Sequence, residues 1–341
     1  MNVTIKDVAR VAKVSVATVS RALNGHSNVT ELARNRVLKV AAVLRYTPHA
    51  AARSLSSRRT HTIGVVLPDL YGEFFSELVR GIDQVARERG QYLLVSSYHG
   101  HPEEQGAALR AMRGRVDGLL LMSPYVNNLG FLTENLLPSL PVVLMNTHLP
   151  DAGFVSLRID NHGGAMQMVE HLVERGHRRI AFIAGPEDNF DARERLRGYR
   201  DALARLLPQA KEWVFPGDFG EASGHAAGGG IAASAERPDA VFAANDMMAL
   251  GCLFGLNQAG IKVPDEIALV GFDDIPLARY VHPPLTTMRV NIAELGGRAL
   301  RALLDADSEA ANESFDSLFV PKLIVRASSG GAAQGERGDS S

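Results

Sequence analysis

The hydrophobic pattern divides the chain into two unlike parts. Up to residue 46, apolar residues recur every three to four positions over short segments, which is typical of amphipathic helices. From residue 61 onward, short apolar runs alternate with longer amphipathic helical segments. The pattern therefore predicts a small all-helical head followed by an α/β body.

The head is expected to contain three short helices. Their inward faces are Ile5, Val8, Ala9 and Ala12; Val19, Ala22 and Leu23; and Val37, Val40, Ala41 and Leu44. Thr4 with Asp7, Ser15 and Thr30 are candidate N-caps, and Asn24-Gly25 stops the second helix because both residues tolerate positive φ. Two short helices joined by a tight turn over a third predict a helix-turn-helix unit.

The body shows strand-like runs at intervals of about 25–30 residues, separated by helices, and this alternation predicts parallel sheets covered by helices. The expected strands are His61–Leu67, Tyr92–Ser96, Gly118–Met122, Val142–Asn146, Arg179–Ala184, Trp213–Phe215, Ala240–Ala243 and Ile267–Phe272. Gly90, Gly176 and Gly260 each end a helix just before a strand. We expect two doubly wound parallel-sheet lobes in series.

Charge is distributed unevenly along the chain. The 341 residues have a formal net charge of only −2, yet residues 1–60 carry +9 and the remainder −11. A basic head on an acidic body indicates that the head alone meets a polyanion. The alternative at this point is a solvated basic face.

Composition excludes several other classes of protein. The only cysteine, Cys252, rules out an internal disulfide and zinc sites built from several cysteines. No apolar run reaches the 18 or so residues of a membrane helix, and the first residues do not resemble a secretion signal. We expect no membrane partner and a bacterial cytoplasmic, nucleoid-associated protein.

The second helix leaves a face that suits a DNA groove. Val16, Ala17, Ser20 and Arg21 point outward, at positions that meet base edges when a recognition helix enters the major groove. Arg21 can contact guanine O6 and N7, whereas Val16 and Ala17 offer only apolar contacts. The alternative is a helical protein-binding module with a polar outer face.

A further short helix is expected after Thr47-Pro48, where Ala50–Ala52 favour helix. About eight residues are too few to be helical alone in water, so the segment should fold only when supported. Leu55 in this basic run is either core at a domain junction or a wedge for a minor-groove base step.

Three stretches together resemble the lactose-repressor (LacI/GalR) family of bacterial transcription regulators: Val3–Ala9, Val14–Asn24 and Tyr46–Leu55. The resemblance implies that Leu55 of two subunits opens a central C-G step of a palindrome, and that Val16, Ala17 and Arg21 form a galactose-repressor-like reading set. It implies DNA contacts by Thr4, Ser15, Val16, Ala17, Thr18, Ser20, Arg21, Asn24, His49, Ala52 and Leu55.

The resemblance also implies a domain plan. The head spans 1–47, a hinge helix and linker 48–60, and a periplasmic-binding-protein-like core 61–328. Lobe 1 is expected at about 61–160 and 290–319, and lobe 2 at about 161–289 and 320–328. Residues 329–341 are expected to be a disordered tail, and its lack of apolar heptads favours a homodimer over a tetramer.

Candidate effector contacts follow strands, because ligands of such folds bind outside the carboxyl ends of strands. They are Asp69, Phe74, Phe75, Asn146, Asp160, Arg195, Phe219, Asn245 and Asp273. The resemblance implies two of them: Arg195–Tyr199 matches the family's Arg-Leu-x-Gly-Tyr/Phe motif, and Asp160-Asn161 resembles its Asp-Asn pair where the chain crosses between lobes. Carboxylate, amide, guanidinium and aromatic groups suit a polyol ring.

Structural alternatives remain for some of these residues. Phe74 could be core, and Asp160 could contact the ligand directly or stand behind such a contact. Asp246 and Asp274, which follow the candidates Asn245 and Asp273, could be ligand contacts or helix N-caps. Purine-binding relatives have an aromatic residue where Thr147 stands, which disfavours base stacking there. The run Gly228–Gly230, where a helix is expected, has no functional explanation from the sequence.

These observations predict a sequence-specific repressor of carbohydrate-utilisation genes that is controlled by a sugar or sugar phosphate between the lobes. The alternatives are a purine-type corepressor-dependent repressor, a sugar-binding protein without DNA function, or an enzyme on the same lobes. No catalytic constellation, metal site or cofactor motif stands out, and His99–Glu104 is interpreted as a solvated loop. The effector, the operator, the target genes and the sign of the response stay open.

Overall fold

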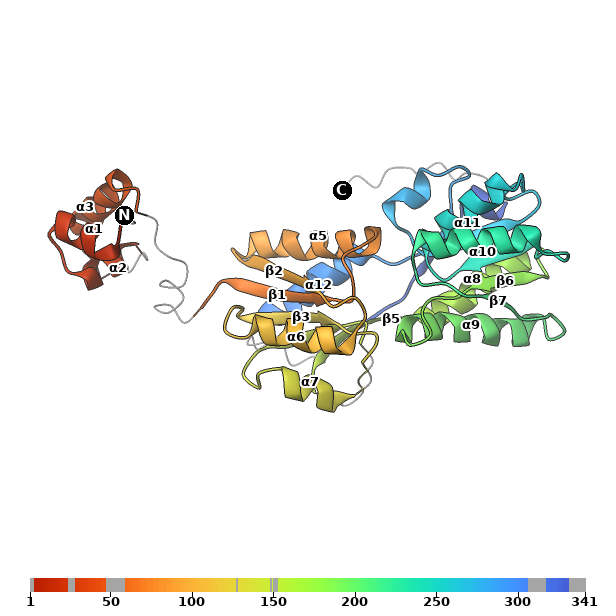
Figure 1. Ribbon diagram of the computed structural model, residues 1–341, viewed down its shortest axis with the longest axis horizontal. Helices are drawn as coiled ribbons and strands as arrows, with labels where there is room; N and C mark the ends of the chain where they lie inside the picture. The colour runs from red at the N-terminus through yellow and green to blue at the C-terminus, as the bar shows by residue number, and fades with distance from the viewer. Residues whose placement is uncertain are drawn as a thin grey trace. The chain divides into compact units, whose positions relative to one another are not determined.

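The computed structural model describes residues 3–23, 28–46, 59–126, 128–147, 149, 153–305 and 317–330 (Figure 1). The chain forms two compact units, Met1–His61 and Thr62–Ser341. Four predicted DNA contacts, Asn24, His49, Ala52 and Leu55, lie outside the described residues, as do residues 48–58 of the expected hinge and 331–341 of the expected tail.

The first unit contains the three predicted helices, α1 (Ile5–Ala12), α2 (Val16–Leu23) and α3 (Glu31–Val43). They pack around buried apolar side chains that include Val8, Val19 and Val37. The helix starts are stabilised as expected. The Asp7 carboxylate accepts hydrogen bonds from the backbone N–H and hydroxyl of Thr4, and Ser15 Oγ accepts from Thr18 N at 3.0 Å.

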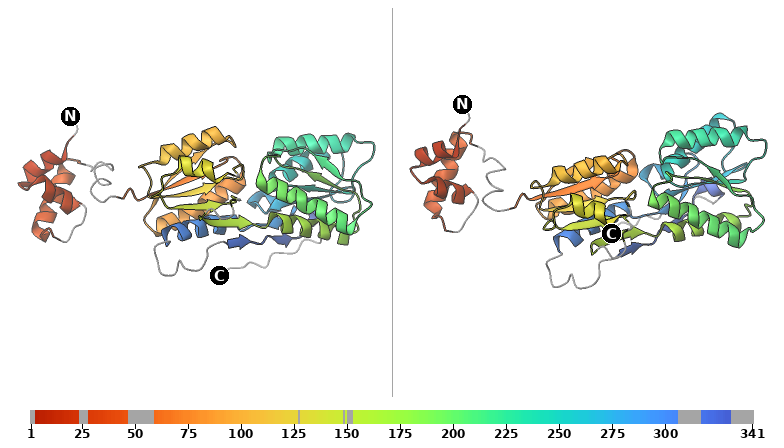
Figure 2. Two further views of the ribbon diagram at one scale, coloured as in Figure 1. Left: turned by 90° about the horizontal axis from the view of Figure 1, so that it is seen from below. Right: turned by 60° about the horizontal axis from the view of Figure 1, so that its bottom comes forward.

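The second unit contains two six-stranded sheets with helices on both faces, so the predicted fold class is confirmed (Figures 1 and 2). The lobe 1 sheet has the order β11-β5-β4-β3-β1-β2 and the lobe 2 sheet β12-β10-β9-β8-β6-β7. Neighbouring strands run parallel, except that β12 pairs antiparallel with β10.

The elements of lobe 1 are β1 (Thr62–Leu67), α5 (Glu73–Glu88), β2 (Tyr92–Ser97), α6 (Pro102–Met112), β3 (Gly118–Met122), α7 (Leu129–Asn135), β4 (Val142–Met145), β5 (Val155–Ile159), α12 (Ile292–Leu304) and β11 (Ser317–Phe319). Those of lobe 2 are α8 (Asn161–Glu174), β6 (Ile180–Ile183), α9 (Phe190–Leu206), β7 (Trp213–Phe215), α10 (Glu221–Ala233), β8 (Ala240–Ala243), α11 (Asp246–Gln258), β9 (Ala268–Asp273), η1 (Pro276–Arg279), β10 (Thr286–Arg289), β12 (Lys322–Ile324) and η3 (Ala327–Ser329).

The chain passes between the two sheets three times: between β5 and α8, between β10 and α12, and between β11 and β12. The last passage brings η3 into lobe 2, where Ser329 is buried and its hydroxyl lies 2.8 Å from that of Thr286. This packed segment extends past the start of the expected tail at residue 329. The segment is held by the buried hydroxyls of Ser328 and Ser329, which form hydrogen bonds with Thr286. Because it lacks an apolar run, the sequence pattern did not indicate that it packs.

Helices α10 and α11 pack closely because glycines on each helix face the backbone of the other helix. A Cβ on Gly224 would overlap the backbone of Met248, one on Gly228 would crowd that of Cys252, and one on Gly251 would overlap that of Glu221. Gly228 therefore has a packing reason that the sequence alone did not provide. Gly229, by contrast, faces open space.

Candidate functional site

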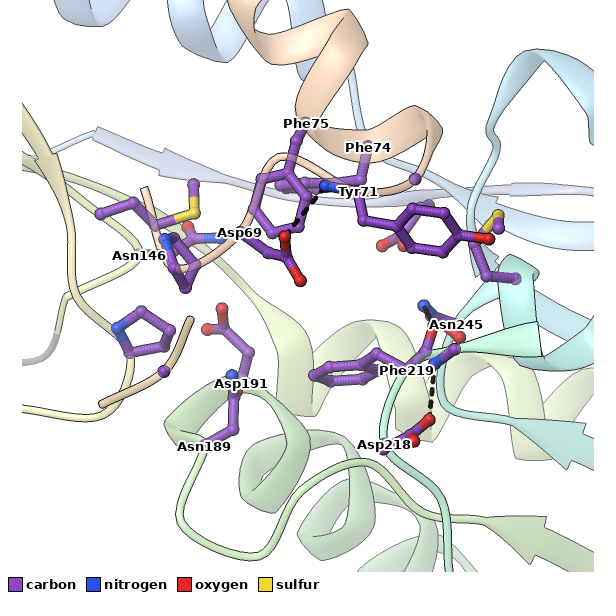
Figure 3. A pocket seen from close by; sticks show the side chains of 18 of the residues that line it. Asp69, Tyr71, Phe74, Phe75, Asn146, Asn189, Asp191, Asp218, Phe219 and Asn245 are labelled. Carbon is purple, nitrogen blue, oxygen red and sulfur yellow. Dashed lines mark hydrogen bonds between the residues drawn. The ribbon is translucent and has the colours of Figure 1, made fainter. Parts of the chain in front are cut away.

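A cavity of about 540 Å³ lies between the two lobes, at the carboxyl ends of their strands (Figure 3). Lobe 1 and lobe 2 both contribute to its walls. The described residues that line it are Pro68, Asp69, Tyr71, Gly72, Phe74, Phe75, His99, Gly100, Met122, Pro124, Tyr125, Asn146, Asn189, Asp191, Arg195, Asp218, Phe219, Gly220, Glu221, Ala222, Asn245, Met247 and Asp273. Its volume suits a small molecule of the size of one or two sugar rings.

The structure brings eight of the nine candidate effector residues to this cavity. They are Asp69, Phe74, Phe75, Asn146, Arg195, Phe219, Asn245 and Asp273. The ninth, Asp160, lies elsewhere: its Oδ1 accepts from Gly163 N at 2.9 Å and so caps α8. It lines a neighbouring cavity of about 230 Å³.

Arg195 is held at the floor of the cavity by its three nitrogens. Nε donates to Asn161 Oδ1 at 2.8 Å, Nη1 donates to the carbonyl of Ala244 at 2.6 Å, and Nη2 lies 3.1 Å from Asp273 Oδ1. The guanidinium also stacks on Phe272, 3.9 Å from the ring centroid. Burial raises the pKa of Asp273 to about 6 although Arg195 opposes the shift.

Asp191 belongs to the same network, and the sequence reading did not single it out. It lies one helical turn before Arg195 on α9, so both side chains share a face. Its Oδ1 accepts from Asn161 Nδ2 at 2.8 Å. Burial raises the pKa of Asp191 to about 7, and the charge of Asp273 adds to the rise, while Arg195 and the amides of Asn146 and Asn161 oppose it.

Backbone geometry also marks the cavity. Four of its non-glycine lining residues have positive φ: His99 (48°), Asn146 (44°), Phe219 (72°) and Asp273 (114°). Such conformations cost free energy in L-residues and concentrate at ligand sites. Here they turn side chains at the strand ends toward the space between the lobes.

Asn245 lines the cavity, but both ends of its amide are already bonded. Oδ1 caps α11 by accepting from Met248 N at 2.9 Å, and Nδ2 donates to the carbonyl of Phe219 at 2.9 Å. The helix cap is therefore Asn245 rather than the alternative candidate Asp246. Asp246 instead accepts from the Thr287 hydroxyl at 2.6 Å and from Ile275 N at 3.0 Å.

Asp274, the other candidate cap, forms a buried ion-pair cluster. Its two oxygens lie 2.5 Å from Arg289 Nε and 2.7 Å from Arg326 Nη2. Because Arg289 ends β10 and Arg326 follows β12, this cluster joins the edge of the lobe 2 sheet and lies outside the cavity.

Direct hydrogen bonds cross from lobe 1 to lobe 2 around the cavity. The Tyr71 hydroxyl donates to Glu221 Oε1 at the start of α10. Glu73 Oε2 accepts from Leu277 N at 2.9 Å, and Phe190 N donates to the carbonyl of Pro124 at 2.9 Å. The lobes are therefore linked on more than one side of the ligand space.

Several lining residues lacked a signal at the level of sequence: Tyr71, His99, Tyr125, Asn189, Glu221 and Met247. They come from loops and first helical turns, where no hydrophobic period separates a lining residue from an exposed one. Asp191 did have a signal, its four-residue spacing from Arg195.

The head presents the predicted DNA-reading face to solvent. The side chains of Val16, Ala17 and Arg21 are exposed, and 41% of Val16 is accessible. Ser15 and Thr18 are joined by a hydrogen bond between their hydroxyls at 2.8 Å, and Thr4 is bonded to Asp7. Ser20, on the second turn of α2, is half-buried.

No group of three or more His, Cys, Asp or Glu side chains in the described ranges has the arrangement of a metal site. Across the same ranges, helices long and apolar enough to cross a bilayer are not found.

Comparison with known families matches both units. Residues 4–49 match the model of bacterial regulatory proteins, lacI family, and residues 169–329 match the periplasmic binding protein-like domain. The transcriptional regulator GalR of Salmonella typhimurium (strain SL1344) is 35% identical over 326 residues, 95% of each chain. The transcriptional repressor PurR of Aliivibrio fischeri (strain ES114) is 36% identical over 332 residues, 95% of this chain and 98% of its own.

Among solved structures, the lac repressor dimer bound to operator and the anti-inducer ONPF aligns with a TM-score of 0.84 at 29% identity, covering 96% of this chain and 99% of its own. The similarity thus runs through the head and both lobes and is not confined to one motif. The chain belongs to the lacI family of bacterial regulatory proteins and is a transcriptional repressor with a ligand-binding, periplasmic-binding-protein-like body.

Proposed function

We propose that this repressor binds a palindromic operator as a homodimer and that a sugar-like small molecule between its lobes changes its affinity for DNA. The observation that carries the proposal is the interlobe cavity, where strained strand ends collect polar side chains beside aromatic rings. Phe74, Phe75 and Phe219 supply apolar faces, and Asp69, Asn146 and Asp273 supply hydrogen-bonding groups, the combination that a sugar ring requires.

In this proposal, Val16, Ala17 and Arg21 read base edges from the exposed face of α2, and Ser15, Thr18, Ser20 and Thr4 contact the DNA around them. The hinge residues His49, Ala52 and Leu55 act in the minor groove with Asn24 nearby. The protein works at the nucleoid in the bacterial cytoplasm and without catalysis or cofactor.

Contacts that cross between the lobes provide the route from ligand to DNA. A ligand that touches both lobes favours one arrangement of them, and the hydrogen bonds of Tyr71 and Glu73 to lobe 2 link the lobes in the arrangement of this structure. The couplings usual for such systems are about 1–3 kcal/mol, or 5–150-fold in affinity.

The structure favours a sugar over a purine at the end of β4. Thr147, at the position where purine-binding relatives have an aromatic residue, is buried and bonded internally. Its hydroxyl accepts from Ser123 N at 2.9 Å and donates to the carbonyl of Met145 at 3.0 Å. It therefore offers no stacking surface to a base.

The test is selection of bound duplexes from a random DNA pool at physiological salt, repeated in the presence of mixed sugars and mixed nucleosides. Without ligand we expect an enriched palindrome with a central C-G step. We expect this enrichment to be lost with the mixed sugars. A pool without an enriched site in all three conditions would contradict the proposal.

A further inference from the structure

Carboxylates are prominent among the polar groups that face the interlobe cavity. Five carboxylates line it among the described residues: Asp69, Asp191, Asp218, Glu221 and Asp273. Figure 3 shows the carboxyl groups of Asp69 and Asp191 pointing into the same space from opposite walls. A ligand at this place meets oxygen atoms that accept hydrogen bonds and repel negative charge.

Two of these acceptors are buried and lack a hydrogen-bond partner. They are Asn146 Oδ1, in a residue that is only 4% exposed, and Glu221 Oε2. Asp273 Oδ1 also faces the cavity, and there its neighbour is Arg195 Nη2 at 3.1 Å. Buried acceptors without a donor cost free energy, so the cavity is built to receive a ligand that brings O–H or N–H groups.

The cationic groups of the lining do not offset this bias. Arg195 is the guanidinium in the described lining, and Asp273 already balances its charge at 3.1 Å. Its Nε and Nη1 donate to Asn161 and the carbonyl of Ala244. Three of the five N–H groups of Arg195 thus face protein acceptors, and its charge is balanced, whereas sites that capture phosphate or carboxylate offer an uncompensated guanidinium charge to the ligand.

We propose that the effector is an uncharged, hydroxyl-rich molecule and that Asp191, together with Asp273, excludes phosphorylated and carboxylated sugars from the cavity. This inference rests on the proposed function and narrows it, because the sequence left sugar and sugar phosphate equally open. Asp191 is then a specificity-determining residue: once ionised, above its raised pKa of about 7, it accepts from hydroxyl donors and repels a phosphate through like charge. Affinities are therefore compared at pH 8.

The pKa values of Asp191 and Asp273 agree with this proposal. It raises the pKa values of Asp191 to about 7 and of Asp273 to about 6, which shows that adding negative charge to this space is unfavourable. A phosphate group would add up to two further negative charges there.

The experiment uses matched pairs of ligands with the full-length protein. D-galactose, D-glucose, D-ribose and adenosine are compared with galactose 1-phosphate, glucose 6-phosphate, ribose 5-phosphate and adenosine 5′-monophosphate, with cellobiose as a larger neutral probe. Thermal shift identifies binders and titration calorimetry measures Kd. We expect at least one neutral compound to bind and its phosphorylated form to bind at least about tenfold more weakly.

Asp191→Asn keeps the shape of the side chain and an oxygen that accepts from Asn161, but it removes the charge. The ratio of the Kd of the phosphorylated ligand to the Kd of its neutral parent should therefore fall. Asp188→Asn is the matched control, because Asp188 lies three residues away, is exposed and does not line the cavity. An unchanged ratio in Asp191→Asn would overturn the role of Asp191.

The outcomes separate this inference from the function on which it rests. A phosphorylated sugar that binds more tightly than its parent, and that changes operator affinity, would overturn the charge selection and support regulation by a ligand. A neutral sugar that binds without changing operator affinity would support the charge selection and contradict the regulatory function. Absence of binding across the whole panel would contradict both.

Discussion

Arg195 Nη2 lies 3.1 Å from Asp273 Oδ1 at the floor of the interlobe cavity, and both side chains are only 5% exposed. The pair joins α9 to the end of β9, and its other partners reach Asn161 at the start of α8. The ligand site and the passage of the chain between lobes are therefore parts of one hydrogen-bond network.

Replacing Arg195 by Lys should weaken the effector response strongly while keeping the structure. The ammonium retains the charge beside Asp273, but it cannot donate at once to Asn161 Oδ1 and the Ala244 carbonyl. We expect ligand affinity to fall about tenfold or more and operator affinity without ligand to change less than about twofold. Calorimetry and operator titration measure the two quantities.

Arg193→Lys is the control for that change. Arg193 is an exposed residue two positions earlier on α9, outside the cavity, where it donates to the carbonyl of Asp188 at 2.9 Å. Equal effects of the two substitutions on ligand affinity would contradict a specific contribution of Arg195 to ligand binding.

Replacing Asp191 by Asn should change the pH dependence of stability. The pKa of Asp191 is raised to about 7 in the folded protein, so the carboxyl group binds its proton more tightly there than in the unfolded chain. Its contribution to stability is complete below about pH 4 and is lost as the pH rises through about 7.

Asn cannot ionise, so Asp191→Asn should melt a few degrees above the wild type at pH 8 and close to it at pH 5. Asp273, whose pKa of about 6 falls in the same window, and Arg195 are present in both proteins, so the difference reports the ionisation of Asp191 together with its electrostatic coupling to Asp273. A melting-temperature difference that is the same at both pH values would contradict the raised pKa.

The helix pair α10 and α11 provides a test of packing. Ala at Gly251 would place its Cβ against the carbonyl of Glu221, so unfolding free energy should fall by at least about 2 kcal/mol. Ala at Gly229, which faces open space on α10, should instead stabilise the protein by roughly 0.5–1 kcal/mol. Denaturant titration measures both, and a destabilised Gly229→Ala would show that its surroundings are not open.

The bond between Tyr71 and Glu221 should favour the linked arrangement of the lobes. Tyr71→Phe removes the hydroxyl but keeps the ring, so ligand affinity should fall several-fold while the melting temperature without ligand changes little. Tyr280→Phe is the control, since Tyr280 is 80% exposed and does not line the cavity. If Tyr280→Phe lowered ligand affinity as much as Tyr71→Phe, the bond between Tyr71 and Glu221 would have no specific role in ligand binding.

The strands of the body were predictable because they are buried on both faces and therefore appear as unbroken apolar runs. For example, β3 was expected and found at Gly118–Met122, and β8 at Ala240–Ala243. The strands β5, β10, β11 and β12 were not predicted. Each contains a polar residue within it or at its start, so none of them appears as an unbroken apolar run.

Polar site residues were harder to assign than strands. A family motif indicated Arg195 and a strand end indicated Asp273, and both residues line the cavity. Whether an amide faces a ligand or its own helix depends on backbone geometry, so the cap formed by Asn245 could not be distinguished from a ligand contact. The family's Asp-Asn pair indicated Asp160 as a residue in or behind the ligand contacts, yet its carboxylate caps α8.

The central claim is that occupancy of the interlobe cavity and operator binding are coupled. The most direct measurement is the affinity of the selected operator duplex for the protein by fluorescence anisotropy, at increasing concentrations of the neutral sugar that binds, together with the affinity of that sugar for free and DNA-bound protein. We predict that operator affinity changes by a factor of about 5–150 and that sugar affinity differs between the two forms by the same factor. A sugar that binds the free and the operator-bound protein with equal affinity would contradict the account.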